Sequence, residues 1–104
     1  HTDAPVALPN LMQVVWATAN RTSRSGAVIG ADERVTPLEA MKMITLWGAE
    51  QCGEQASKGS LEPGKLADMV ILSDNPLTID PMKINSIVVL ETFKDGKSVY
   101  KRQP

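Results

Sequence analysis

The first side chains that could do chemistry stand at the very start of the chain, where one residue separates His1 from Asp3. On an extended segment, two residues with this spacing point to the same side. An imidazole beside a carboxylate can hold a metal ion or share a proton. The alternative is a frayed end without a chemical role, because terminal residues are often poorly anchored.

The other reactive side chains are isolated from one another. Cys52 is the single cysteine, which excludes an intrachain disulfide and favours a reducing compartment, so we expect a cytoplasmic protein. As a catalytic thiol it has no histidine near it in the sequence. Arg21 and Arg24 could clamp an anion, but solvated loop arginines are the more common case. Trp16 and Trp47 fall on predicted helices, so we interpret them as packing residues rather than a stacking platform.

Size and charge restrict the possible partners. The 104 residues carry a net charge of -1, and 42% of them are hydrophobic, which is typical of one small globular unit. No strong electrostatic field is available for nucleic acid, and no apolar run reaches the length of about 18 residues that a membrane helix needs. We therefore expect the chain to bind neither nucleic acid nor a membrane. Zinc usually takes three or four ligands, so no cofactor is expected in this chain by itself.

A first helix is predicted to begin near Leu11 and to fade near Asn20 or Arg21. Asn10 offers a side-chain acceptor before the apolar run, with Gln13 three residues later, as in a variant capping box. The predicted apolar face consists of Leu11, Val14, Val15 and Thr18. Residues 21–35 are then predicted to form a loop of unusual length.

A second helix is predicted over residues 37–52. Thr36 and Glu39 have capping-box spacing, Pro37 occupies the first helical position, and Gly53 is a left-handed stop. Gly48 inside this helix costs about 1 kcal/mol relative to alanine. A close contact with a neighbouring element would explain its presence.

The remainder of the chain has β character. Pro63 and Gly64 predict a type II turn. The apolar run 68–73 predicts a strand covered on both faces, and residues 79–85 predict a helical turn. Two further strands, 86–93 and 97–100, flank Asp95-Gly96 and predict a hairpin with a type I′ turn. Helices that precede strands in this way indicate an α+β fold.

Two stretches resemble the C-terminal part of the amidohydrolase superfamily, in the amidohydrolase 3 or YtcJ-like branch. Residues 59–72, GSLEPGKLADMVIL, match the pattern GxxxPGKxADxVxL. Residues 2–6, TDAPV, are similar to the segment Ser-Asp-x-Pro-Val at the end of the last barrel strand. Together with the helices and strands that follow these stretches, the resemblance covers nearly the whole chain.

The resemblance implies a fold and a division of the chain. Residues 1–57 would form the end of a TIM-like (β/α)8 barrel, with the end of the last strand and two helices. Residues 58–104 would supply strands of the small composite β-sandwich beside it. We therefore expect the chain to be the C-terminal piece of a longer protein, with exposed apolar faces that favour a homo-oligomer or another partner.

The resemblance also implies an activity. Asp3 matches the acidic residue that, in this family, binds the metal or carries a proton for the attacking water. The full enzyme would use a divalent metal, with zinc expected, to hydrolyse an amide or cyclic amide, a non-peptide C–N bond. At the position of His1 the family usually has a small residue. The resemblance therefore implies no metal-ligand role for His1. Lys65 is expected to be a solvated or packing residue rather than a carboxylated ligand.

The isolated chain is expected to be inactive, because most of the barrel and its histidine ligands would lie outside it. The alternative is a freestanding binding or assembly domain without catalysis. What precedes His1 in the gene would discriminate between the two.

Overall fold

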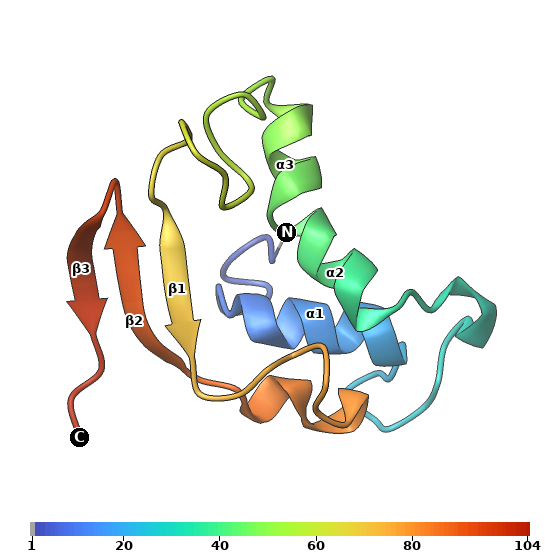
Figure 1. Ribbon diagram of the computed structural model, residues 1–104. Helices are drawn as coiled ribbons and strands as arrows, with labels where there is room; N and C mark the ends of the chain where they lie inside the picture. The colour runs from blue at the N-terminus through green and yellow to red at the C-terminus, as the bar shows by residue number, and fades with distance from the viewer. Residues whose placement is uncertain (1) are drawn as a thin grey trace.

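The computed structural model describes residues 2–104, and it places a group of helices beside a three-stranded antiparallel sheet (Figure 1). The mixed helical and β architecture is as predicted. None of the helices in this described part is long and apolar enough to cross a membrane. The elements in chain order are α1 (Leu11–Asn20), the 3-10 helix η1 (Ala31–Glu33), α2 (Pro37–Met43), α3 (Leu46–Gln51), β1 (Met69–Leu72), the 3-10 helix η2 (Pro81–Ser86), β2 (Val89–Lys94) and β3 (Lys97–Lys101).

Helix α1 begins and ends where the sequence predicts. The Asn10 side-chain oxygen accepts from the backbone N–H groups of Met12 (3.1 Å) and Gln13 (3.3 Å). At the other end Arg21 adopts a left-handed conformation, and its N–H donates to the Ala17 carbonyl at 2.8 Å.

The buried face of α1 differs from the predicted one. Its buried apolar residues are Met12, Val15 and Ala19, whereas Leu11 is 51% exposed. The helix is rotated because η2, far away in the sequence, packs along that side.

The main core joins α1, α2 and the η2 segment. Its fully or almost fully buried residues are Met12, Val15, Ala40, Ile84 and Ile87. Hydrogen bonds fasten α1 to η2, because the Trp16 indole N–H donates to the Met82 carbonyl (3.0 Å) and the Asn20 amide donates to the Pro81 carbonyl (2.9 Å). This core contains residues from both sides of the predicted boundary between the barrel part (residues 1–57) and the sandwich part (residues 58–104). That boundary stays a prediction.

The predicted helix 37–52 is wrong as a single element, although its beginning is correct. The Thr36 hydroxyl accepts from the Glu39 N–H at 3.2 Å, and the Glu39 carboxylate accepts from the Thr36 N–H at 2.8 Å, which forms the capping box. The chain then leaves helical geometry at Thr45, which has ψ of -95°, and α3 starts anew. The Thr45 hydroxyl donates to the Met41 carbonyl at 2.7 Å, a bond of the kind that bends helices.

The close approach predicted at Gly48 occurs instead at Gly59. A Cβ atom on Gly48 would meet only the Met43 carbonyl oxygen, at 3.4 Å. A Cβ atom on Gly59 would lie 2.8 Å from Ala49 Cβ and 3.0 Å from Leu46 Cα, and Gly59 has a φ of +94°. Glycine at the start of the GxxxPGKxAD stretch therefore lets the loop pack directly on α3.

Both predicted turns of the β half are confirmed. Gly64 has a φ of +92°, and the Lys65 N–H donates to the Glu62 carbonyl at 3.1 Å, as in a type II turn. Asp95 and Gly96 both have positive φ values, +50° and +76°, as a type I′ hairpin requires. The helical turn predicted over 79–85 is found as η2, and the last two strands form the predicted hairpin.

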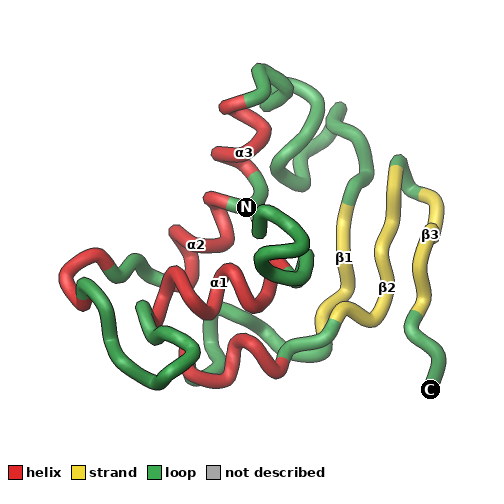
Figure 2. Tube along the Cα trace, turned by 180° about the vertical axis from the view of Figure 1, so that it is seen from behind, coloured by secondary structure: helices red, strands yellow, loops and turns green. Residues whose placement is uncertain are grey.

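The prediction that the first strand is covered on both faces is wrong for this chain. Val70 and Ile71 of β1 are 49% and 47% exposed. In the described part of the chain, β1 pairs with β2 alone, and the sheet order β1-β2-β3 leaves β1 and β3 as edges. Seen from behind in Figure 2, β1 is again the strand nearest to the helices, and β3 is the farthest.

Candidate functional site

Asp3 stands at the beginning of a tight turn. The Val6 N–H donates to the Asp3 carbonyl at 2.9 Å, and the Ala7 N–H donates to the Thr2 carbonyl at 3.2 Å. The backbone of Asp3 is left-handed, with a φ of +49°, a conformation that aspartate tolerates better than most residues. These bonds fix the backbone of an aspartate that is itself exposed.

Helix α1 lies beside this turn. A shallow cleft of 260 Å³ lies between the turn segment, where Thr2, Ala7 and Leu8 line it, and helix residues such as Gln13 and Ala17. Thr2, the neighbour of Asp3, therefore lies beside the helix that Asn10 caps. The predicted His1–Asp3 pair is not tested, because His1 lies outside the described residues.

The described residues do not assemble a metal centre by themselves. Among residues 2–104, no group of three or more histidine, cysteine, aspartate or glutamate side chains lies close enough to hold an ion. Asp3 thus offers one carboxylate, which can serve as a single ligand or as a proton acceptor.

Arg21 is engaged by its own loop. Its Nε donates to the Ile29 carbonyl at 3.0 Å, and Ile29 N–H donates back to the Arg21 carbonyl at 2.8 Å. A bridge between Thr22 and Val28 closes the loop further. Arg24 is exposed. The bonds of Arg21 are those of a loop residue, and the anion clamp stays a prediction.

Cys52 and Lys65 have structural surroundings. Cys52 is exposed at the C-terminal cap of α3. The ammonium of Lys65 donates to the Ser60 hydroxyl at 2.8 Å and pairs with the Glu62 carboxylate at 3.3 Å, and only 12% of its side chain is exposed. Lys65 is therefore a packing residue, as expected, that holds the loop before β1.

Asp68 has a structural role that the sequence reasoning missed. Its carboxylate accepts from the Asp95 N–H at 2.8 Å, and next to it the Gly96 N–H donates to the Ala67 carbonyl at 2.9 Å. The last two residues of the PGKxAD stretch therefore hold the tip of the hairpin. No sequence signal could have found this bond, because 27 residues separate its two partners.

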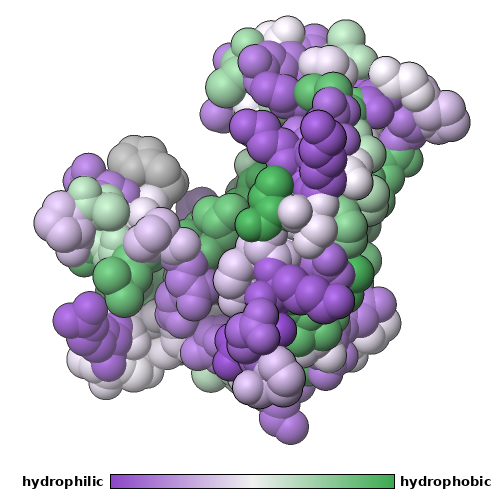
Figure 3. All heavy atoms as spheres, turned by 90° about the vertical axis from the view of Figure 1, so that its left-hand side faces the viewer, coloured by the Kyte–Doolittle hydropathy of each residue, from purple (hydrophilic) through white to green (hydrophobic). Residues whose placement is uncertain are grey.

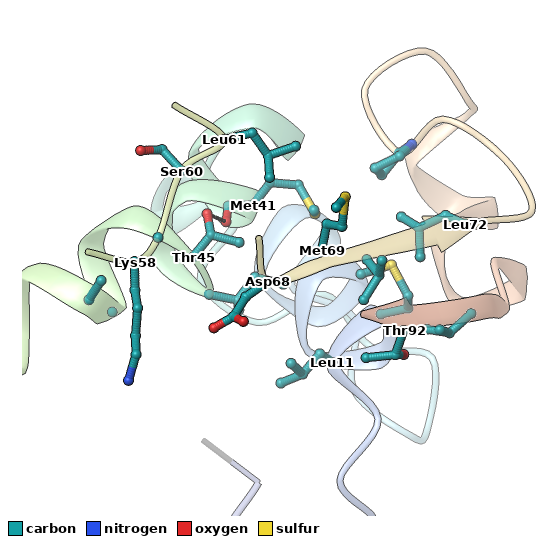
Figure 4. Close-up of a pocket in the computed structure, with 18 of the residues that line it drawn as sticks. Leu11, Met41, Thr45, Lys58, Ser60, Leu61, Asp68, Met69, Leu72 and Thr92 are labelled. Atoms are coloured by element: carbon teal, nitrogen blue, oxygen red, sulfur yellow. Dashed lines mark hydrogen bonds between the residues drawn. The ribbon is translucent and has the colours of Figure 1, made fainter. Parts of the chain in front are cut away.

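An apolar groove of 1330 Å³ lies between β1, β2, α2 and α3. Figure 4 shows Met41, Leu61 and Met69 directed toward one another, whereas Lys58 extends away from them. Small-molecule sites usually occupy about 300–1,000 Å³ and contain several convergent polar groups. Here Lys58 pairs with Glu54 at 3.0 Å and Asp68 binds the hairpin, so these polar groups are already engaged.

Comparisons with known proteins agree over almost the full chain. The model of the amidohydrolase family matches residues 1–100. N-substituted formamide deformylase from Arthrobacter pascens is 31% identical over 97% of this chain. The YtcJ protein of Bacillus subtilis, named as an amidohydrolase without a stated substrate, is 27% identical over 97% of this chain.

A solved structure extends the similarity to the fold. An amidohydrolase from Thermotoga maritima superimposes with a TM-score of 0.63 and is 32% identical, over 96% of this chain. This chain spans 19% and 20% of the length of the two relatives and 22% of the length of the solved structure. The match to the family model leads to one conclusion about identity: this chain belongs to the amidohydrolase family, in the YtcJ-like branch that its sequence indicates.

Proposed function

We propose that this chain is the C-terminal part of a metal-dependent amidohydrolase that hydrolyses an amide or cyclic amide at a non-peptide C–N bond. The observation that carries the proposal is the family match over residues 1–100, within which Asp3 stands on a turn with a fixed backbone. The chain spans only about a fifth of its relatives, so the proposed active site would draw most of its residues from a longer polypeptide.

The expected cofactor is a divalent metal ion, with zinc as the first candidate. The donor set of this chain is compatible with one contribution to such a site, because the Asp3 carboxylate is exposed and an oxygen ligand suits these ions. When bound, the ion would lower the pKa of a water molecule and polarise a carbonyl group. The missing ligands would be supplied by the remainder of the enzyme.

The proposed step for Asp3 is a proton transfer. Its carboxylate accepts a proton from the attacking water while the water oxygen forms a bond to the amide carbon. The same proton then passes to the leaving nitrogen as the C–N bond breaks, so the products are a carboxylic acid and an amine. The bonded turn would serve this step by fixing the backbone from which the carboxylate projects.

The substrate class is a small amide. Arthrobacter N-substituted formamide deformylase suggests that N-substituted formamides should be among the first compounds tested. We further propose a cytoplasmic location, on the strength of the single unpaired cysteine.

An immunoblot of the source cells tests whether the longer polypeptide exists. An antibody raised against residues 1–104 should detect a band several times heavier than 11.2 kDa. A band near 11.2 kDa would contradict the proposal and favour the alternative, a small binding or assembly domain without catalysis.

Replacement of Asp3 tests the proposed chemistry in that longer polypeptide. Asp3→Asn keeps the size of the side chain but removes the proton acceptor, so kcat should fall by about 10²–10⁴. Asp32→Asn, at an exposed aspartate of η1, is the matched control and should retain activity. Activity should also disappear with a chelator and return with zinc. Equal rates for the Asp3 and Asp32 variants would exclude the proton-transfer role, and the 104-residue chain alone should be inactive.

A further inference from the structure

The cleft beside the Asp3 turn has no part in the proton transfer proposed above. It measures 260 Å³, and aliphatic side chains form much of its lining, among them Ala7, Leu8, Val14 and Ala17. The face of the molecule toward β3 has a different character, because hydrophilic residues predominate there (Figure 3). The cleft is therefore suited to an apolar group.

Helix α1 turns separate faces to the core and to the cleft. Met12, Val15 and Ala19 are buried, whereas Gln13 and Ala17 are exposed and line the cleft. Residues four positions apart lie on the same side of a helix, so Gln13 and Ala17 belong to one wall. A larger side chain at position 17 would thus narrow the cleft without entering the core.

The chemistry proposed for Asp3 brings one part of the substrate close to this cleft. Asp3 returns its proton to the leaving nitrogen, so that nitrogen must come within hydrogen-bond distance of the carboxylate, about 2.6–3.2 Å. Thr2 lines the cleft, and its Cα lies about 3.8 Å from the Cα of Asp3, as in any adjacent pair. A group carried by the leaving nitrogen would therefore lie near the cleft.

The volume of the cleft suits a part of a substrate better than a whole one. Sites for complete small molecules usually occupy about 300–1,000 Å³, whereas an apolar cavity of about 150 Å³ accommodates benzene. At 260 Å³ the cleft has room for one aryl or branched alkyl group. Two polar residues of its lining are already engaged, because the Asn10 side chain caps α1 and the Thr18 hydroxyl donates to the Val14 carbonyl at 2.8 Å.

We propose that this cleft is a subsite for an apolar N-substituent of the amide substrate, and that Ala17 determines how large a substituent the enzyme accepts. The inference rests on the proposed function, since it depends on the leaving nitrogen lying at Asp3. It narrows the substrate class to amides that carry an aryl or alkyl group on nitrogen. The name of the Arthrobacter relative, N-substituted formamide deformylase, supports this choice of substituent.

Substitutions at Ala17 in the longer polypeptide test the subsite with two substrates, N-methylformamide and N-benzylformamide. Ala17→Val and Ala17→Leu narrow the cleft in two steps. The ratio of kcat/KM for the benzyl compound to kcat/KM for the methyl compound should fall at each step, by at least about tenfold for leucine. A ratio is insensitive to the fraction of active enzyme, and if the leucine variant does not fold, the valine variant decides.

Ala31→Leu is the matched control, because Ala31 is an exposed alanine of η1 outside the lining of the cleft. It makes the same change of side chain and should leave the ratio as it is in the native enzyme. A fall of equal size in Ala31→Leu would overturn the proposal.

The outcomes separate the subsite from the proposed function. Hydrolysis of both amides with the same ratio in the native enzyme and the Ala17 variants would overturn the subsite and leave the function standing. If neither amide is hydrolysed, the proposed function is wrong, and calorimetry with N-benzylformamide tests the subsite alone. Binding that is at least about tenfold weaker in Ala17→Leu, but not in Ala31→Leu, would then support the subsite. Equal binding by the two variants, or no binding by the native protein, would overturn it too.

Discussion

The α1–η2 region and the β1 region both contain apolar residues, but these residues are buried to different degrees. In both regions the apolar side chains require burial, but Ile84 of η2 is completely buried, whereas Ile71 of β1 is 47% exposed. The difference arises because η2 meets α1 and α2 within this chain, while β1 has a partner on one edge only. An apolar run therefore predicts that a segment requires burial, but it does not predict that the same chain supplies the cover.

The strongest test of this comparison removes the same side chain in the two regions of the 104-residue chain. Ile84→Ala should lower the free energy of unfolding by about 2–5 kcal/mol, because it leaves a cavity in the core. Ile71→Ala should cost about 1 kcal/mol, mainly through lower β propensity. Urea unfolding followed by circular dichroism measures both values. Similar losses would mean that β1 is already covered in solution.

A second test concerns the contact between the loop before β1 and helix α3. An alanine at either Gly59 or Gly53 must adopt a positive φ, which costs about 1–2 kcal/mol. Only at Gly59 would the new Cβ also collide, 2.8 Å from Ala49 Cβ, which should add about 1–3 kcal/mol. No atom lies within 4 Å of the corresponding position at Gly53.

Thermal unfolding of Gly59→Ala and Gly53→Ala measures this difference directly. A lower midpoint for Gly59→Ala would support a loop that is seated on α3 and contributes to the wall of the groove. Equal midpoints would indicate that the loop moves away from α3 in solution, and the groove would then lack a fixed wall on that side.

The smallest expected effect is a pH dependence of the helical half. The backbone N–H of Thr36, and next its hydroxyl group, hold the pKa of Glu39 below its ordinary value of 4.5. The unfolded chain therefore binds a proton more readily than the folded one, and the capping box stabilises the fold fully above the ordinary pKa. This stabilisation should be lost as the pH falls through the lowered pKa.

Thermal unfolding checks the direction of this pH effect. The midpoints of the native chain and of Glu39→Gln are compared near pH 7 and near pH 3. The advantage of the native chain should shrink in acid, because glutamine does not titrate. An advantage that grows in acid would contradict the assigned direction. Because Glu39 is exposed, we expect a small change.

Much of the local structure could be predicted from the sequence, because it depends on contacts between near neighbours. Asn10 and the Thr36–Glu39 pair fix the starts of α1 and α2 through bonds that span two or three residues. Gly64 and Asp95-Gly96 fix their turns through the φ values that they allow. Asp3, the candidate site residue, was singled out by its spacing from His1, and its proposed role came from a resemblance. Neither could predict its place on a bonded turn.

The tertiary structure decided what no local pattern contains. It rotated the buried face of α1 toward Met12 and Ala19, because η2 packs there. It interrupted the predicted helix 37–52 at Thr45. The close approach to a neighbouring element occurs at Gly59 and not, as predicted, at Gly48. The tertiary structure also left β1 half exposed. The physical reason is common to these cases: caps and turns are short-range bonds encoded by a few adjacent residues, whereas burial depends on which distant segment comes to lie alongside.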